Sequence, residues 1–431
     1  MNLREALVFW NPWWTEATQR LPVADRRARR ELTGLMKRKE ILCLSGVRRC
    51  GKSTVLRLLI DELLDQGAPP VNILHLNLED PVFKGLSVFA LYEKYLEFMN
   101  PTGSLYLFFD EIQGAEDWQL DIRKLYDGIP NVKMVLTGSN SSLLKGEYAT
   151  HLTGRTLIYE MYPFDFKEAA LIKGVLSSFE PPALLKNKPR LLHLFAEYME
   201  YGGFPEVVQE GDRKLKNLLL KEYYLSILFR DVLRRYAIRQ ARKYEAAAHY
   251  FLSNIAGLFS AKRIAALLNI SMHTLEDYLG FLEDVYLFFP VNHFSFSVKR
   301  QITSPRKIYT VDNGFLSAVS FRFSEDAGKK LENLVFGELK RYGRPIYYWK
   351  GKNECDFIIA DDRAGFQAIQ VCYALTDPQT KKRELNGLSE ALQAINAEKG
   401  LILTYDEFED LSHQGKTIEV RPVWHWLLSA E

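Results

Sequence analysis

Residues 41–64 read Ile-Leu-Cys-Leu-Ser-Gly-Val-Arg-Arg-Cys-Gly-Lys-Ser-Thr-Val-Leu-Arg-Leu-Leu-Ile-Asp-Glu-Leu-Leu. The centre of this stretch, Gly46–Thr54, fits the pattern G-x-x-x-x-G-K-[ST] at every position. The apolar run Ile41–Ser45 is typical of a buried parallel strand, and Val55–Leu64 has the periodicity of a helix. In such an arrangement the backbone N–H groups of the loop hold a polyphosphate, while a lysine reaches the β- and γ-phosphates. The stretch therefore predicts a nucleotide site, formed by Gly46, Val47, Arg48, Arg49, Cys50, Gly51, Lys52, Ser53 and Thr54.

Continuous apolar runs recur through the first part of the chain, and each ends in polar or glycine residues. Continuous rather than alternating runs are typical of a parallel sheet that is covered by helices on both faces. The segments between the runs are long enough for crossover helices. We therefore expect a doubly wound α/β fold with its ligand at the carboxyl ends of the strands. The five runs are Ile41–Ser45, Val71–Asn77, Ser104–Phe109, Val132–Thr137 and Thr156–Met161.

Two acids follow directly after the third apolar run. Asp110 and Glu111 end this strand, as expected for the second half of a phosphate-loop site. ATP hydrolysis needs Mg²⁺, a positioned water and stabilisation of the charge on the γ-phosphoryl group. Asp110 would hold Mg²⁺ together with the hydroxyl of Ser53, and Glu111 would polarise the attacking water. The alternative is a solvated acidic strand end.

Further candidate catalytic groups follow the next strands. Ser139 or Asn140 could orient the lytic water or sense the γ-phosphate, although a plain turn explains them equally well. Arg155 comes just before the fifth strand and is a candidate arginine finger, supplied within the chain or to a neighbour. A structural salt bridge is the competing interpretation of Arg155. The catalytic set is thus Lys52, Glu111, Asn140 and Arg155.

The composition narrows the class of protein. The 431 residues are 47% apolar and 26% charged, which is ordinary for a globular protein of several domains. A net charge of +2 gives no global signal for nucleic acid. The four cysteines have no metal-ligand or disulfide spacing, which favours a reducing compartment. Without an apolar leader or a run of about 18 apolar residues, we expect a cytoplasmic protein without membrane contact, with the aromatic start at Phe9–Trp14 docked onto the protein body.

The middle of the chain is rich in helix formers. Pro181, Pro182 and Pro189 indicate a loop. A long helix is expected from about Lys214 to Phe259, and its basic residues either form a solvated face or contact nucleic acid or a subunit. These residues are Arg230, Arg234, Arg235, Arg239, Arg242 and Lys243.

Residues 260–290 have the pattern of a helix-turn-helix. A short helix, a turn at Asn269–Ser271 and a second helix capped by Ser271 are expected, followed by a β-wing at Phe288–Val291. The second helix is short of arginine and so is poorly suited to contact the phosphates of DNA. DNA binding and a role in packing alone therefore both stay open. Its exposed candidates are Met272, His273, Glu276 and Asp277.

Strands return after residue 305, which predicts a separate α/β domain at the C-terminal end of the sequence. The expected strands are Lys307–Val311, Pro345–Trp349, Asp356–Ala360, Ala368–Tyr373 and Gly400–Thr404, with helices near 328–342 and 378–397.

Taken together, the motifs resemble those of a large prokaryotic AAA-type ATPase family. This family joins an AAA+ domain to a winged helix and a C-terminal domain similar to PD-(D/E)XK nucleases. The resemblance implies that Lys52, Ser53, Asp110 and Glu111 have the roles given above, that Asn140 is the polar sensor, and that an arginine of one subunit completes the site of the next. The motifs are Gly46–Thr54, Asp110–Gln113 with Trp118, Leu136–Asn140, Gly154-Arg155, Pro163–Phe166 and Gly202–Glu206.

These patterns divide the chain into five expected segments. They are an N-terminal helical lead-in (1–40), an AAA+ P-loop ATPase core (41–170), a helical lid or linker (171–240), a winged helix-turn-helix (241–304) and a nuclease-like domain (305–431).

Two hypotheses about function follow. The first is an ATPase whose nucleotide state moves the winged-helix and nuclease-like domains against DNA, with ATP and Mg²⁺ bound and a homo-oligomer as the candidate assembly. The second is a nucleotide-gated protein-interaction switch that hydrolyses slowly and never touches DNA. The near-neutral charge and the acids of the second helix favour the second.

The nuclease-like segment departs from the family pattern, and we predict that it does not cut DNA. The resemblance matches Glu338 on a helix and Asp356 on a strand, but Gln370-Val371-Cys372 replaces the Glu-x-Lys that binds metal and activates water. Incubation with plasmid DNA and Mg²⁺ should leave the DNA intact. Cleavage that disappears in Asp356→Ala would contradict this prediction. Candidate cations for binding alone are Lys350, Lys352, Lys381, Lys382 and Arg383.

Overall fold

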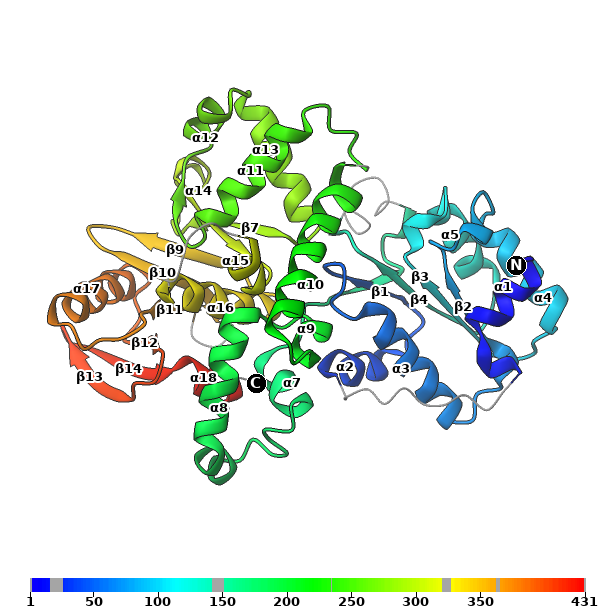
Figure 1. Cartoon of the computed structure of the whole chain (residues 1–431), viewed down its shortest axis with the longest axis horizontal. Coiled ribbons are helices and arrows are strands. Elements are labelled where there is room, and N and C mark those ends of the chain that lie inside the picture. Colours follow the sequence, from blue (N-terminus) through cyan, green and yellow to red (C-terminus); the bar gives the residue numbers. More distant parts are fainter. Residues whose placement is uncertain are drawn as a thin grey trace. The chain divides into compact units, whose positions relative to one another are not determined.

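The computed structural model of the chain describes residues 2–15, 26–141, 151–233, 235–319, 327–361 and 365–429. The chain forms two compact units, Met1–Tyr162 and Pro163–Glu431. Figure 1 labels their elements, and each unit is described by itself.

Unit 1 is built on a parallel sheet of five strands in the order β2-β3-β4-β1-β5. The predicted α/β fold with a parallel sheet is confirmed. Strand β4 lies between the strand that leads into the phosphate loop and the strand that ends in the two acids. The strands are β1 (Ile41–Ser45), β2 (Ile73–Asn77), β3 (Leu105–Asp110), β4 (Val132–Gly138) and β5 (Thr156–Glu160).

Helices cover both faces of this sheet. One face packs in a large apolar cluster with α1, α4 and α5. Helix α3 contacts β3 and β4 and packs against α2, so these two helices form the other layer. The helices are α1 (Leu3–Trp10), α2 (Arg27–Leu35), α3 (Lys52–Asp65), α4 (Val88–Met99) and α5 (Trp118–Gly128), with 3-10 turns η1 (Pro12–Trp14), η2 (Pro70–Asn72), η3 (Pro81–Phe83) and η4 (Ile112–Gly114).

The aromatic N-terminal segment docks onto β2, as expected. The indole N–H groups of Trp13 and Trp14 donate to the Ile73 carbonyl at 3.2 and 3.0 Å. Asn11, which is fully buried, accepts from the His75 amide at 2.6 Å and donates to the His75 carbonyl at 2.8 Å. These bonds satisfy backbone groups at the free edge of the sheet.

Unit 2 contains a second, mixed sheet of nine strands. Their order is β13-β14-β12-β11-β10-β9-β7-β8-β6. The strands are β6 (Leu258–Phe259), β7 (Phe288–His293), β8 (Arg306–Thr310), β9 (Ile346–Lys350), β10 (Glu354–Asp361), β11 (Gly365–Val371), β12 (Lys399–Thr404), β13 (Glu409–His413) and β14 (Lys416–Pro422).

The boundary predicted between residues 304 and 305 falls inside this sheet. Strand β7 pairs with β8 on one side and with β9 on the other. Backbone hydrogen bonds therefore continue from the helix-turn-helix segment into the C-terminal strands.

Thirteen helical elements surround this sheet in the described part of unit 2. They are α7 (Phe166–Ile172), α8 (Pro181–Tyr201), α9 (Pro205–Gln209), α10 (Arg213–Ser226), the π-helix η6 (Ile227–Leu233), α11 (Ala241–Ser253), α12 (Ala261–Leu268), α13 (Met272–Asp284), α14 (Val298–Thr303), α15 (Gly314–Val319), α16 (Ala327–Arg341), α17 (Pro378–Ala394) and α18 (Val423–Ser429).

Two predictions about these helices were wrong. The expected loop at residues 181–189 is part of α8, because Pro181 and Pro182 occupy the first helical positions, which need no N–H donor. Pro189 lies on an exposed part of this helix, where water can solvate the carbonyl that loses its partner. The expected single helix from 214 to 259 is broken by η6 and by the left-handed Ala237 (φ 47°). Arg234 of the predicted basic face lies outside the described residues.

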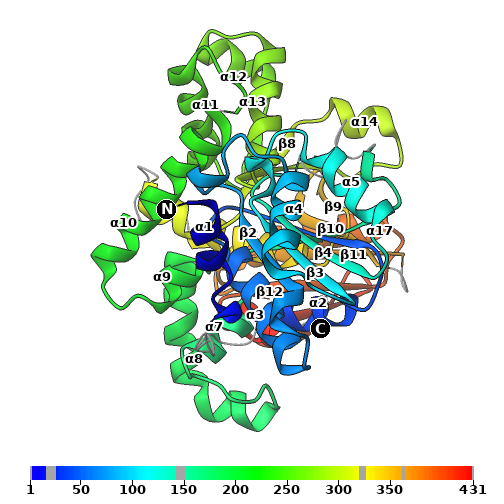
Figure 2. The ribbon, with the colours of Figure 1, turned by 90° about the vertical axis from the view of Figure 1, so that its right-hand side faces the viewer.

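The expected helix-turn-helix geometry is present. Helix α12 ends at the left-handed Asn269 (φ 51°), and the hydroxyl of Ser271 accepts from the Thr274 amide at 3.0 Å to start α13. Helices α11, α12 and α13 lie together in both views (Figure 2). Strands β6, β7 and β8 complete the segment, with β8 between the other two.

No helix within the described ranges has both the length and the apolar character needed to cross a membrane.

Candidate functional site

The predicted phosphate loop connects β1 to α3 and depends on two glycines. Gly51 has a φ of 99°, in the left-handed region that favours glycine. Gly46 packs so closely on the segment after β5 that an added Cβ would lie 2.0 Å from the Met161 carbonyl oxygen. The Met161 amide in turn donates to the Ser45 carbonyl at 2.7 Å. The segment that follows β5, the strand beside β1, therefore holds the start of the loop in place.

Lys52 and Ser53 begin the helix that follows the loop. Lys52 is buried, and its Nζ donates to the carbonyls of Gly46 at 2.9 Å and Val47 at 3.2 Å. Ser53, at the second position of α3, is exposed, so its hydroxyl is accessible to a metal ion. The amino end of α3 supplies unpaired N–H groups and the positive end of the helix dipole.

A buried arginine that lies before α2, outside the phosphate-loop motif, binds the backbone of the loop. It was not among the predicted site residues. Arg26 donates to the Cys50 carbonyl at 2.5 Å and to the Tyr162 carbonyl at 3.2 Å. It directly precedes α2, whose first turn also carries Arg27, Arg29 and Arg30, and no motif distinguishes Arg26 from these. Burial raises the pKa of the Cys50 thiol, which favours a structural role for Cys50 over a redox one.

The two acids meet β4 through one hydroxyl. Thr137 donates to Asp110 Oδ1, and its oxygen accepts from the Glu111 amide at 2.9 Å. All three residues are buried. Thr137 was part of a quoted motif but had no predicted role, because its contacts depend on β4 lying beside β3.

The carboxylate of Glu111 is also positioned. Glu111 has a left-handed φ of 50°, which turns the chain out of β3. The side chain of Gln113 donates to Glu111 Oε2 at 2.5 Å. A left-handed non-glycine residue is uncommon and strained, and such residues cluster at functional sites.

The other residues of the predicted nucleotide site surround this centre. Asn140 is fully buried, and its carbonyl accepts from the Ser45 hydroxyl at 3.1 Å, so the end of β4 lies beside the end of β1. Arg48 forms an ion pair with Glu79 at 3.0 Å. Arg49 is exposed with a left-handed φ of 69°.

Arg155 lies at the opposite end of the sheet. Strands β1 and β5 run parallel with Ile41 beside Thr156 and Ser45 beside Glu160, so Arg155 precedes the strand pair while the loop follows it. Its guanidinium pairs with Asp127 at 3.1 Å. A catalytic role of Arg155 in the site of its own chain is therefore wrong. A role in the site of a neighbouring subunit stays a prediction.

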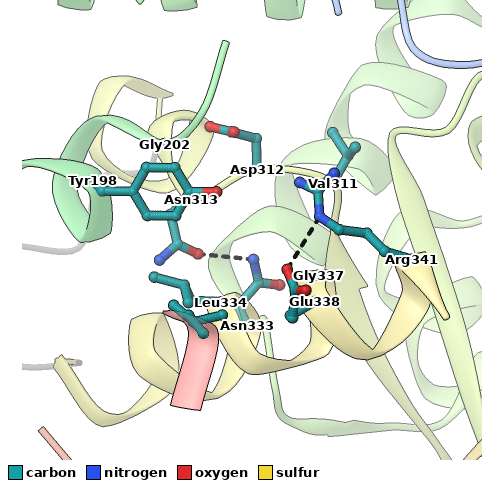
Figure 3. A pocket seen from close by; sticks show the side chains of 11 residues that line it. Tyr198, Gly202, Val311, Asp312, Asn313, Asn333, Leu334, Gly337, Glu338 and Arg341 are labelled. Carbon is teal, nitrogen blue, oxygen red and sulfur yellow. Dashed lines mark hydrogen bonds and ion pairs between the residues drawn. The ribbon is translucent and has the colours of Figure 1, made fainter. Parts of the chain in front are cut away.

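The C-terminal acids do not meet as the resemblance implied. Glu338 lines a separate pocket of unit 2, beside Arg341 at 3.4 Å (Figure 3). The carboxylate of α16 that approaches Asp356 is Glu332, because Nζ of Lys307 binds both, at 2.9 Å from Glu332 and 2.8 Å from Asp356.

Gln370 and Cys372 lie beside this second set of acids. Gln370 Oε1 accepts from the Asp356 amide at 3.2 Å, and its Nε2 donates to Glu384 at 2.5 Å. Burial raises the pKa of the Cys372 thiol to about 11. A neutral amide and a neutral thiol therefore stand at the positions where the resemblance expects a metal ligand and a lysine.

Three family models match the chain. Residues 38–170 match a model described as AAA domain. Residues 192–326 and 327–426 match two models described as domains of unknown function. The second match extends past β8, so β7 and β8 fall within the same family model.

Two curated relatives match over most of their length. Uncharacterized protein MJ1544 of Methanocaldococcus jannaschii is 33% identical over 406 residues, which cover 90% of this chain and 88% of the relative. An uncharacterized protein of Haemophilus influenzae is 31% identical over 396 residues, covering 90% and 94%. The solved structure of Aeropyrum pernix Orc1 in complex with DNA is 14% identical, and the match covers 76% of this chain and 97% of that one with a TM-score of 0.29.

The contact between Gly46 and Met161 generates a prediction about nucleotide binding. Gly46→Ala places a methyl group against a backbone carbonyl that cannot move away without disturbing β5. We expect a lower melting temperature and at least a tenfold weaker binding of a fluorescent ATP analogue, which corresponds to a loss of about 1.4 kcal/mol of binding free energy. Gly34→Ala is the control, because nothing lies within 4 Å of its added Cβ. Unchanged binding by Gly46→Ala would contradict the prediction.

Proposed function

The chain belongs to the same family as MJ1544 and has an AAA domain at residues 38–170, and from this premise we propose that it is a Mg²⁺-dependent ATP hydrolase whose nucleotide state moves unit 2. The main support is a pair of hydrogen bonds of the Thr137 hydroxyl, which donates to Asp110 and accepts from the Glu111 amide. These bonds hold the two acids at the carboxyl end of the sheet, where the phosphate loop also begins.

Each residue of this site would have a definite role. Backbone amides of the loop and the ammonium of Lys52 would hold the phosphates, while Ser53 and Asp110 would bind Mg²⁺. The metal, when bound, neutralises charge that develops on the β- and γ-phosphate oxygens. Glu111, oriented by Gln113, would polarise the attacking water.

The segment after β5 provides a route from the loop to unit 2. On its unit 1 side, Met161 contacts Ser45 and Gly46. Three residues later, the Phe164 amide donates to the Gly203 carbonyl at 2.8 Å, and its carbonyl accepts from the Tyr198 hydroxyl at 2.7 Å. A shift of the loop would therefore reach α8 through a short covalent link that is anchored at both ends.

The pocket drawn in Figure 3 is lined by Tyr198, whose hydroxyl holds the Phe164 carbonyl, and by Gly202 next to Gly203. Asp312 accepts from the amides of Gly203 at 2.7 Å and Gly314 at 2.8 Å. Asn333 of α16 donates to the side chain of Asn313 at 2.8 Å. Gly203 thus binds both Phe164 at the start of unit 2 and Asp312 just after β8, and Asn313 binds α16. A displacement of Phe164 would therefore be passed through Gly203 to the second sheet.

We also propose that unit 2 contacts DNA through the helix-turn-helix and the segment between β7 and β8, arranged as a winged helix. The acids of α13 that speak against phosphate contact are paired, Glu276 with Arg306 at 2.6 Å and Asp277 with His273 at 2.9 Å. Exposed cations lie on α12 and α14, namely Lys262, Arg263, Lys299 and Arg300.

A protein-interaction switch is the second candidate. Exposed apolar side chains flank the same cations on α14, with Phe296 78% and Ile302 75% exposed. Apolar surface of this kind favours contact with protein. The two candidates share the nucleotide site and differ in what unit 2 contacts and in the rate of hydrolysis, which is slow in the switch.

Assembly into a homo-oligomer is part of the proposal. Arg155, which is excluded from its own site, would reach the γ-phosphate of a neighbour, and its ion pair with Asp127 would have to open.

The hydrolytic site predicts two distinct losses. Lys52→Ala should lose nucleotide binding and turnover together, because the lysine contacts the phosphates. Glu111→Gln should keep binding and lose turnover by about a hundredfold or more, since only the activated water is affected. Steady-state ATPase assays with and without Mg²⁺, beside equilibrium binding, separate these outcomes. Turnover by Lys52→Ala equal to that of the wild type would refute the enzymatic proposal.

The DNA proposal predicts salt-sensitive binding that depends on α14. Replacing Lys299 and Arg300 with alanine should weaken binding for all sequences and reduce the slope of log affinity against log salt by about 2. Lys84→Ala with Lys94→Ala removes the same charge from unit 1 as a control. Mobility-shift titrations with and without ATP give the measurement. Absence of DNA binding in both nucleotide states would leave the interaction switch as the function of unit 2.

A further inference from the structure

A buried lysine lies where three carboxylates of unit 2 converge. Nζ of Lys307, on β8, lies 2.8 Å from Glu354 and 2.8 Å from Asp356 on β10. The same nitrogen lies 2.9 Å from Glu332 on α16. Its side chain is only 1% exposed. One ammonium therefore connects three elements that are distant in sequence.

These carboxylates need a cation at this point. Each has an oxygen within 2.9 Å of the same atom, so the three oxygens lie within twice that distance of one another. Like charges this close repel strongly in a buried site. Burial and the neighbouring Asp356 raise the pKa of Glu332 to about 8, and the Tyr309 hydroxyl donates to Glu332 at 2.6 Å. Although burial lowers the pKa of Lys307, Asp356 and Glu332 raise it well above its usual value, so the ammonium stays charged.

The lysine also occupies the place that a metal ion would need. Divalent cations that prefer oxygen ligands bind at the centre of converging carboxylates, at roughly 2.0–2.6 Å. The ammonium fills that centre, and two cations cannot share it. Across the part of the chain that the structure describes, no group of three or more His, Cys, Asp and Glu side chains is arranged to hold a metal ion.

A cleft opens above this cluster. Glu332, Glu354 and Asp356 line it, and so do cations from β9, the following turn and α17. Lys350 pairs with Glu354 at 3.2 Å, and Arg383 pairs with Glu384 at 2.5 Å, so most acids of the cleft have a cationic partner within the protein.

We propose that Lys307 is the resident cation of this cluster, and that it excludes divalent metal ions from the cleft and holds β8 against β10 and α16. The cleft is therefore metal-independent. This inference goes beyond the proposed function, because it concerns neither the nucleotide site nor the choice between DNA and a protein partner.

The test replaces the ammonium and asks whether a metal ion can take its place. Lys307→Met in the full chain leaves the acids without a cation, and in EDTA its melting temperature should fall by about 10 °C, as expected when one partner of a buried ion pair is removed. MnCl₂ should restore at least half of this loss. The melting temperature of the wild type should not change in MnCl₂. All melting curves are recorded without nucleotide, so that metal binding together with nucleotide at the phosphate loop does not contribute.

Lys216→Met is the matched control. Lys216 is also buried, but it pairs with the single carboxylate of Glu197, which cannot chelate a metal ion. This variant should be destabilised and show no recovery in MnCl₂.

A charge-neutral variant covers the case in which Lys307→Met does not fold in EDTA. Lys307→Met combined with Glu354→Gln and Asp356→Asn removes the repulsion and should fold without metal. Failure of MnCl₂ to rescue Lys307→Met, while this triple variant folds, would overturn the proposal. Stabilisation of the wild type by MnCl₂ that is lost in Asp356→Asn would also overturn it.

Discussion

The hydrogen bonds of Thr137 fix the geometry of the nucleotide site. The hydroxyl donates to Asp110 and accepts from the Glu111 amide, and it reaches both only because β4 lies beside β3. Strand β4 also pairs with β1, whose carboxyl end continues into the phosphate loop. A single strand between the two halves of the site thus sets the distance from the loop to the acids, and a change in register would separate them.

The contact between Gly46 and the Met161 carbonyl extends this constraint beyond the site. The loop starts against the segment that leaves β5, and the chain continues from this segment directly into unit 2. Phe164 is held by Tyr198 and by Gly203, and Gly203 belongs to the motif Gly202–Glu206 that supports the resemblance to the family. Two motifs far apart in sequence thus form one anchor.

The sequence was informative where local pattern decides structure. All five strands of unit 1 were predicted to within two residues, because each is a continuous apolar run, and the loop is specified by its own residue types. Other features depend on contacts between distant segments. Glu332 and Glu338 are both acids of α16, but six positions at about 100° each place them on different faces, and only the packing of the helix decides which one meets Asp356. Lys307 and Tyr309 lie two positions apart and therefore on the same buried face of β8. A lysine that shares a face with an aromatic residue in an apolar strand is the signal that could have indicated a buried ion pair.

The measurement that tests the central claim most directly is Mg²⁺-dependent ATP turnover by Thr137→Val. Valine has nearly the same shape and lacks the hydroxyl, so the fold and the phosphate loop should remain while the two acids lose their common partner. Thr310→Val, which removes a buried hydroxyl bonded to the Leu287 carbonyl in unit 2, controls for the general cost of such a change. The account predicts that kcat falls by about tenfold or more in Thr137→Val with nucleotide affinity retained, and that Thr310→Val keeps its kcat. An unchanged kcat in Thr137→Val would contradict it.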